Sequence, residues 1–148
     1  MPDITDVATR SRMMSGIRGK NTKPELIVRR ALHRLGLRYQ LHVRNLPGAP
    51  DLVFRRHKVV VFVHGCFWHQ HDCSLFKMPS SRTEFWTQKL DRNRDRDREH
   101  MVHLLHDGWR VAVVWECSLR AAAKANDETF LERLADWIRT SESKSIEL

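Results

Sequence analysis

The chain has 148 residues, 41% of them hydrophobic and 30% charged, which is the composition of one ordinary globular domain. Lys and Arg outnumber Asp and Glu by 26 to 18, and the net charge of +8 favours a polyanionic partner, nucleic acid first and an anionic membrane surface second. The longest apolar run, Val59 to Val63, is too short to cross a bilayer, and the first residues lack the apolar stretch of a secretory signal.

Basic residues are concentrated near the beginning of the chain. Between Arg10 and Arg44 there is one acid, Glu25, against ten basic residues: Arg10, Arg12, Arg18, Lys20, Lys23, Arg29, Arg30, Arg34, Arg38 and Arg44. A solvated surface is the ordinary explanation of such a segment. Because like charges repel each other, so large an excess favours a phosphate-binding role instead. Residues 1–20 show little periodicity, and we interpret them as an arm.

The first predicted helix follows this arm. Residues 22–25 (Thr-Lys-Pro-Glu) have the spacing of a capping box with Pro24 in the first turn. An apolar repeat then continues to Gly36, which is expected to end the helix. Residues 39–43 alternate between apolar and polar side chains and predict a strand.

Two further strands are expected around a short turn. A loop rich in turn residues over 45–50 leads to Asp51 and a strand over residues 52–54. A nearly all-apolar strand over residues 58–63 suits the centre of a sheet. Residues 64–79 then form a loop rich in histidine, cysteine and aromatic side chains.

The second half of the chain predicts two helices and a strand. Residues 81–84 form a second capping box, and the long helix that follows is expected to end at Gly108. Residues 109–115 predict a strand, residues 127–139 an amphipathic helix, and the polar residues from 140 a frayed tail. The order αβββαβα predicts a mixed α/β protein in which helices cover a small sheet.

Pro50 and Asp51 stand where a loop meets a predicted strand. An acid in this place, followed by a hairpin into a buried strand, is the frame of the PD-(D/E)xK nuclease core, whose first carboxylate binds Mg²⁺. The dipeptide is also common in turns. The usual acid and lysine of the next strand are missing, because residues 62–64 are Phe, Val and His. These residues therefore indicate either another kind of protein or a divergent nuclease that uses histidine.

The odd number of cysteines, three, argues against a disulfide scaffold. Cys66 and Cys73 flank a histidine-rich loop, and Cys117 follows the last predicted strand. Together with His69 or His71 they would complete a closed tetrahedral zinc site. The alternative is three reduced cysteines in the core. The remaining loop histidines would be left for acid–base chemistry.

The long predicted helix carries an apolar stripe that two polar residues interrupt. Steps of three and four residues bring onto one face Trp86, Leu90, Asn93, Asp97, Met101 and Leu104. An inward carboxylate needs a partner, and a histidine of the 64–71 loop would suit Asp97, because a carboxylate orients an imidazole and stabilises its charged form. Alternatively, Asp97 belongs to an exposed run of Arg and Asp over residues 92–98.

Three aromatic residues lie close to these polar groups in the sequence. Phe67 and Trp68 are adjacent in a polar loop, and Trp86 lies near the start of the long helix. Two neighbouring bulky rings in a loop cannot easily both be core, whereas apolar wedges between base pairs are a known way to distort DNA. Core packing is an equal alternative for Trp86.

Six strings of this sequence match one known family: residues 8–11 (ATRS), 46–51 (LPGAPD), 64–69 (HGCFWH), 82–86 (RTEFW), 108–111 (GWRV) and 114–117 (VWEC). They resemble the Vsr-type very-short-patch-repair DNA mismatch endonucleases. The resemblance covers nearly the whole chain, and HGCFWH is its most specific string. The family also lacks the second acid and the lysine that are missing here.

The resemblance implies a restriction-endonuclease-like core. It implies a nick in one strand beside the thymine of a thymine–guanine mismatch, which arises by deamination of 5-methylcytosine. In that case Asp51 binds the catalytic Mg²⁺ and His64 belongs to the same centre. His69 would be the general base, supported by Asp97. Glu25 would lie near the site, although it also fits the capping box without any catalysis.

The resemblance further implies a structural zinc site and a set of DNA contacts. The implied zinc ligands are Cys66, His71, Cys73 and Cys117. The aromatic residues expected to enter the duplex are Phe67, Trp68 and Trp86, and further DNA contacts are expected from Asn93, Met14 and Ile17. Phosphate contacts are expected from Arg10 and Arg12.

We therefore expect a DNA-contacting arm over residues 1–20, an endonuclease domain over residues 21–139 and a polar tail over residues 140–148. The protein should act as a monomer on double-stranded DNA in the bacterial cytoplasm, associated with the nucleoid and not with a membrane. One alternative is another nuclease of the same fold, which would normally keep the acid and the lysine. The other is a non-catalytic zinc DNA-binding module, which would have no reason to bring together Asp51, His64, His69 and Asp97.

Overall fold

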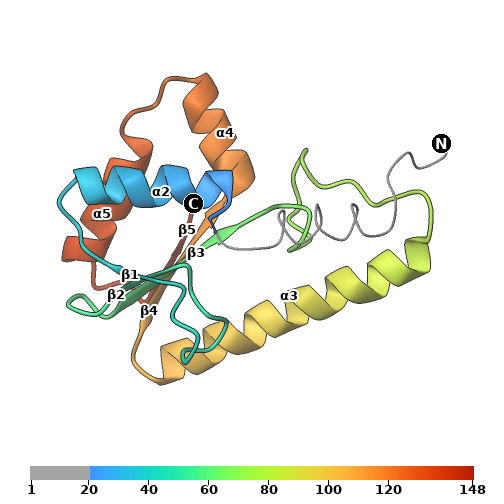
Figure 1. Cartoon of the computed structure of the whole chain (residues 1–148), viewed down its shortest axis with the longest axis horizontal. Coiled ribbons are helices and arrows are strands. Elements are labelled where there is room, and N and C mark those ends of the chain that lie inside the picture. Colours follow the sequence, from blue (N-terminus) through green and yellow to red (C-terminus); the bar gives the residue numbers. More distant parts are fainter. Residues whose placement is uncertain (1–20) are drawn as a thin grey trace.

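The computed structural model describes residues 21–148 (Figure 1). The predicted arm over residues 1–20, with Arg10, Arg12, Met14 and Ile17, lies outside the described residues. In chain order the elements are α2 (Lys23–Arg34), β1 (Gln40–Leu41), β2 (Leu52–Phe54), β3 (Val59–His64), α3 (Thr83–His106), β4 (Arg110–Trp115), α4 (Glu116–Lys124), α5 (Phe130–Thr140) and β5 (Ser145–Glu147).

Within residues 21–148 the strands form one five-stranded sheet in the order β1-β2-β3-β4-β5. β1, β2 and β3 are antiparallel neighbours, whereas β3, β4 and β5 run parallel. The β3–β4 ladder extends from Val59 opposite Arg110 to His64 opposite Trp115. Parallel neighbours need a long connection, and α3 supplies it between these two strands.

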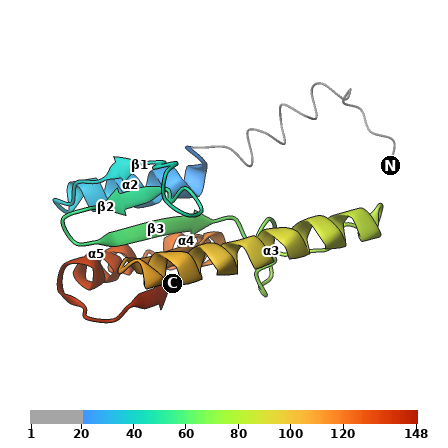
Figure 2. The same cartoon turned by 90° about the horizontal axis from the view of Figure 1, so that it is seen from below.

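Helices cover both faces of the sheet. Figure 1 shows α2, α4 and α5 on one side and α3 on the other, and Figure 2 shows α3 extending beyond the strands. Side chains alternate along each strand, so the two faces have separate cores. Val61 belongs to the core that contains Leu32 of α2 and Leu134 of α5. Val60 belongs to the core that contains Leu104 of α3. The predicted mixed α/β sheet covered by helices is confirmed.

The helix ends agree with the sequence patterns in most places. Thr22 caps α2, because its Oγ1 accepts a hydrogen bond from the Glu25 N–H at 3.4 Å. Gly36 and Gly108 follow the ends of α2 and α3 with φ of 93° and 88°, a conformation that glycine adopts without strain. The capping box over residues 81–84 is wrong. Helix α3 begins at Thr83 after Arg82, which lies in the left-handed region and makes no side-chain cap.

The frayed tail predicted from residue 140 is also wrong. Residues of β5 pair with β4 in parallel, with Ser145 opposite Val111. Ile146 and Leu148 pack on the core beneath α2 and α5. The strand has three residues, which is too few for an alternating pattern to be recognised among polar neighbours. Two smaller differences are the short β1, predicted over residues 39–43, and the unpredicted helix α4.

No helix within residues 21–148 combines the length and the apolar character needed to span a bilayer.

Candidate functional site

A cleft of about 1000 Å³ opens beside the ends of β2 and β3. The start of α2, the segment before β2, the loop after β3 and the middle of α3 all contribute to its walls. Two groups of polar side chains line it, one around Asp51 and one around His69. Because these segments lie far apart in the sequence, only the sheet topology brings them together.

The first group consists of Glu25, His42 and Asp51, whose ligand atoms all lie within 4.8 Å of one another. Glu25 comes from the first turn of α2 and is 2% exposed. Asp51 directly precedes β2, and its Oδ2 accepts a hydrogen bond of 2.7 Å from the Val63 N–H of β3. Burial raises the pKa of Asp51 to about 7, against an ordinary 3.8, and the Glu25 charge raises it further, whereas the Val63 N–H opposes the rise. Glu25 and Asp51 thus place two carboxylates of like charge side by side in a buried site. Such a pair of oxygen ligands suits a hard divalent cation.

The second group consists of His64, His69 and Asp97, again within 4.8 Å of one another. His69 Nδ1 is hydrogen-bonded to Asp97 of α3 through a short contact. The predicted partnership between Asp97 and a histidine of the loop is therefore confirmed, and the alternative of an exposed charge run is wrong for this residue. The ring of His64 stacks on that of His69 with centroids 3.7 Å apart. Burial lowers the pKa of His64 well below its ordinary value, and His69 and His71 lower it further, so His64 is neutral at pH 7.

Side-chain hydrogen bonds join the loop that carries His69 to the middle of α3. Besides the His69–Asp97 bond, Gln70 Nε2 donates to Asp91 Oδ1 at 2.8 Å. Asn93 Nδ2 donates to the carbonyl oxygen of Trp68 at 3.3 Å. The inward stripe predicted for this helix is confirmed at Asn93 and Asp97. The contact of Asn93 is with the loop backbone, so this residue holds Trp68 in place.

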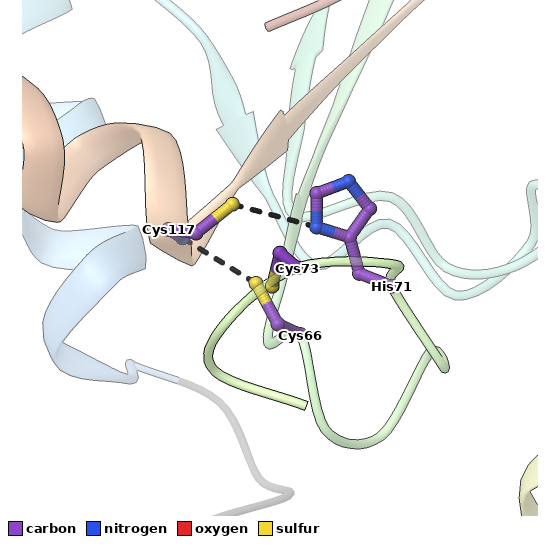
Figure 3. Close-up of side chains that lie close together, drawn as sticks. All are labelled: Cys66, His71, Cys73 and Cys117. Atoms are coloured by element: carbon purple, nitrogen blue, oxygen red, sulfur yellow. Dashed lines mark hydrogen bonds between the residues drawn. The ribbon is translucent and has the colours of Figure 1, made fainter. Parts of the chain in front are cut away.

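Three further side chains of the same loop converge on Cys117 at the start of α4. Figure 3 shows Cys66, His71, Cys73 and Cys117 pointing toward one another, and their ligand atoms lie within 4.8 Å of each other. His71 Nδ1 lies 3.4 Å from Cys117 Sγ. The edges of a zinc tetrahedron with sulfur and nitrogen ligands measure roughly 3.5–3.8 Å. Burial raises the pKa of the Cys66 thiol to about 12, which a bound cation would reverse.

The three aromatic residues singled out in the sequence form one cluster at the wall of the cleft. Phe67 and Trp68 have ring centroids 4.9 Å apart, and each lies within 6 Å of the Trp86 ring, at 5.6 and 5.9 Å. All three are only partly buried. They pack on one another and also face the cleft, so core packing and a ligand contact are compatible here.

The structure brings nine of the predicted site residues to this cleft and four to the adjoining cysteine cluster, and it adds one residue that the sequence did not indicate. His64 falls in the group of His69, whereas Asp51 is grouped with Glu25 and His42. His42 was missed because it looked like a polar position in an alternating strand. Only the pairing of β1 with β2 reveals that it lies beside Asp51.

In this strongly basic chain, carboxylates and histidines converge in one cleft, beside a cluster of thiols and an imidazole. This combination is typical of a metal-dependent nuclease. The profile of the family described as DNA mismatch endonuclease Vsr matches residues 2–75. The chain is 46% identical over 138 residues to the DNA mismatch endonuclease Vsr of Escherichia coli (strain K12), which covers 93% of this chain and 88% of that protein.

Two nicking enzymes are also similar to this chain. The Type II nicking enzyme V.XorIIP of Xanthomonas oryzae pv. oryzae is 47% identical over 119 residues, 80% of this chain and 88% of that protein. The Type II nicking enzyme V.NmeAIP of Neisseria meningitidis serogroup A is 42% identical over 123 residues, 83% of this chain and 88% of that protein. The chain therefore belongs to the DNA mismatch endonuclease Vsr family, and it is a DNA-nicking endonuclease.

Asp51→Asn should stabilise the protein in the absence of divalent metal. The folded pKa of Asp51, about 7, lies above its unfolded value of 3.8, so stability present at pH 4 is lost as pH rises through 7. The asparagine keeps an acceptor for Val63 and carries no charge. We expect a gain in unfolding free energy of at most about 4 kcal/mol at pH 8 that disappears near pH 4.

Urea unfolding in EDTA at several pH values measures this effect. Asp136→Asn, at an exposed position of α5, is the control and should change stability little at either pH. A variant of Asp51 that is equally destabilised at pH 4 and pH 8 would show that Asp51 mainly serves packing.

Proposed function

We propose that this protein nicks one DNA strand beside the thymine of a thymine–guanine mismatch arising from deamination of 5-methylcytosine, in a Mg²⁺-dependent hydrolysis. The observation that carries the proposal is the meeting of a carboxylate pair, a His–Asp pair and three aromatic rings in one cleft. The name of the Escherichia coli relative, a DNA mismatch endonuclease, supports the mismatch, and the names of the nicking enzymes support cleavage of one strand.

The carboxylates fit a catalytic magnesium ion. Asp51 and Glu25 offer oxygen donors within 4.8 Å of each other, and oxygen is the donor that this cation prefers. When bound, Mg²⁺ supplies polarisation of the phosphate and a more acidic water. We assign Asp51 as its main ligand, with Glu25 and His64 nearby in the same centre. The Val63 N–H holds the Asp51 carboxylate in a fixed direction at the end of β3.

His69 is our candidate for the general base. A histidine that donates its Nδ1 proton to Asp97 has an unprotonated Nε2, which can accept a proton from the attacking water. Asp97 fixes the ring and stabilises its charged form after the transfer. His64, neutral and stacked on His69, keeps a second positive charge away from the ring that must take up the proton.

The aromatic cluster is our candidate for mismatch recognition. Phe67, Trp68 and Trp86 would enter the base stack, which costs roughly a few kcal/mol per disrupted step. A thymine–guanine pair is easier to unstack than a matched pair, so insertion would convert deformability into specificity. Met14 and Ile17 would approach the duplex from the arm, Arg10 and Arg12 would bind phosphates, and Asn93 would keep Trp68 in place.

The remaining assignments follow from the family. We propose a restriction-endonuclease-like core over residues 21–139 behind an arm over residues 1–20, acting as a monomer in the bacterial cytoplasm and associated with the nucleoid. The cluster of Cys66, His71, Cys73 and Cys117 would hold a structural zinc ion, because three thiols and an imidazole are too soft a set for magnesium. The two sites would then take different metals.

Cys73→Ser should remove zinc and lower stability. Binding of a structural metal is coupled to folding, so we expect loss of about one metal equivalent per chain and a clear drop in melting temperature. Elemental analysis of protein purified without chelators gives the metal content. Ser74→Ala, at the neighbouring exposed position, is the control. Absence of zinc from the unaltered protein would contradict the assignment.

His69→Ala should lower the single-turnover nicking rate about 10²–10⁴-fold, and Asp97→Asn should lower it less. Asp97 acts through His69, so the double variant should be no slower than His69→Ala. Asp95→Asn, on the exposed side of α3, is the matched control and should keep the unaltered rate. Losses that add in the double variant would show that the two residues act independently.

Nicking of matched duplexes with a T–G or a T–A pair, with and without Mg²⁺, tests the function itself. We expect cleavage of the T–G duplex only, and only with the metal.

Trp68→Ala should reduce the preference for T–G in binding titrations, and Trp68→Phe should reduce it less. Arg12→Ala should weaken binding to both duplexes equally and flatten the salt dependence. If Trp68→Ala weakens the affinity for both duplexes by the same factor, Trp68 serves packing, and the proposed insertion of the aromatic rings into the base stack is wrong.

A further inference from the structure

Glu25 is a buried carboxylate beside Asp51, and two other residues, His42 and Arg29, fix its direction. Both of its oxygens contact the ring of His42, with Nε2 2.9 Å from Oε1 and 3.0 Å from Oε2. Arg29, one turn along α2, donates Nη1 to Oε2 at 3.0 Å. Since the Arg29 contact marks the carboxylate as an acceptor, His42 Nε2 is the donor in its own contact. Its lone pair is therefore not available to a metal in this arrangement.

His42 is itself held against Asp51 through its backbone. Its N–H donates to the carbonyl oxygen of Asp51 at 3.1 Å, one position beyond the Leu41–Leu52 pair of β1 and β2. Its φ of 49° lies in the left-handed region, which side chains with a Cβ atom adopt at a cost. Such conformations persist where the surroundings fix them, and they are common at functional sites. One residue thus touches Asp51 with its backbone and Glu25 with its ring.

We propose that His42 is a positioning residue of the divalent-cation site, which sets the direction of the Glu25 carboxylate relative to Asp51. The inference rests on the proposed function, in which these two carboxylates take the cation. A carboxylate that accepts from one ring N–H on both oxygens cannot rotate freely toward or away from its neighbour. Loss of that contact leaves the Arg29 hydrogen bond on one oxygen and removes the bond that spans both oxygens, which costs the site its preorganisation.

Two substitutions separate the ring contact from the backbone. In His42→Asn, the asparagine adopts the left-handed conformation readily, but its side chain is too short to reach Glu25. His42→Gln is one methylene longer and can still donate an N–H to the carboxylate. His103→Ala, at an exposed position of α3, is the control. Thermal melts of all three establish that the fold is intact.

Mn²⁺ titration of the protein without DNA, followed by electron paramagnetic resonance of the free ion, gives a direct measure of the cation site. Partners of metal ligands typically contribute about 10–100-fold to affinity, so we expect His42→Asn to weaken Mn²⁺ binding by at least about 10-fold. His42→Gln should restore most of it. The Mg²⁺ concentration for half-maximal nicking should rise by a similar factor, while binding of a T–G duplex in EDTA stays unchanged.

A double variant tests whether His42 acts through Glu25. Once Glu25→Gln has removed the charge, His42→Asn should have little further effect on Mn²⁺ affinity. If the unaltered protein and His42→Asn bind Mn²⁺ with equal affinity, the role of His42 is overturned. The proposed function would stand, since the unaltered protein would still bind the metal and nick DNA. Equal losses in His42→Asn and His42→Gln would overturn it in favour of direct ligation by the imidazole. Failure of the unaltered protein to bind Mn²⁺ or to need Mg²⁺ would overturn the proposed function, and this inference with it.

Discussion

The in-register parallel pairing of β3 with β4 is the constraint on which the site depends. The ladder ends with His64 opposite Trp115, so the chain leaves both strands at the same edge of the sheet. Two residues further on, Cys66 and Cys117 face each other, and the Cys117 N–H lies 3.4 Å from Cys66 Sγ. The ring of His71 then stacks on Trp115 at 3.9 Å. A slip of this register would separate the cysteine cluster and displace the loop that carries His69.

The loop after β3 is held from two sides, which explains how a segment without regular structure can present aligned side chains. The cysteine cluster holds it to the start of α4, and α3 holds it through Asp91, Asn93 and Asp97. His69 and Trp68 lie between these two attachments. Long side chains on a loop with one attachment would move too much for either proton transfer or insertion into a duplex. The part of α3 that extends beyond the sheet therefore supports the loop after β3 at a place that the strands do not reach.

How far the sequence predicts this structure depends on how local the signal is. The inward position of Asp97 follows from helical spacing alone, and the cysteine set follows from residue type, so both could be predicted. The pairing of Glu25 with His42 could not, because it joins the start of a helix to the end of a two-residue strand through a left-handed residue. The capping box before α3 failed for a related reason: Arg82, inside the predicted box, takes the left-handed conformation, so the helix begins at Thr83 without a side-chain cap.

Within residues 21–148, both edges of the sheet are short, with two residues in β1 and three in β5. An edge strand offers its unpaired backbone groups to any other extended chain, and long flat edges are common starting points for aggregation. Here a second copy that added to either edge would gain only a few hydrogen bonds before the chain turned away. Edges as short as these keep neighbouring copies from joining their sheets.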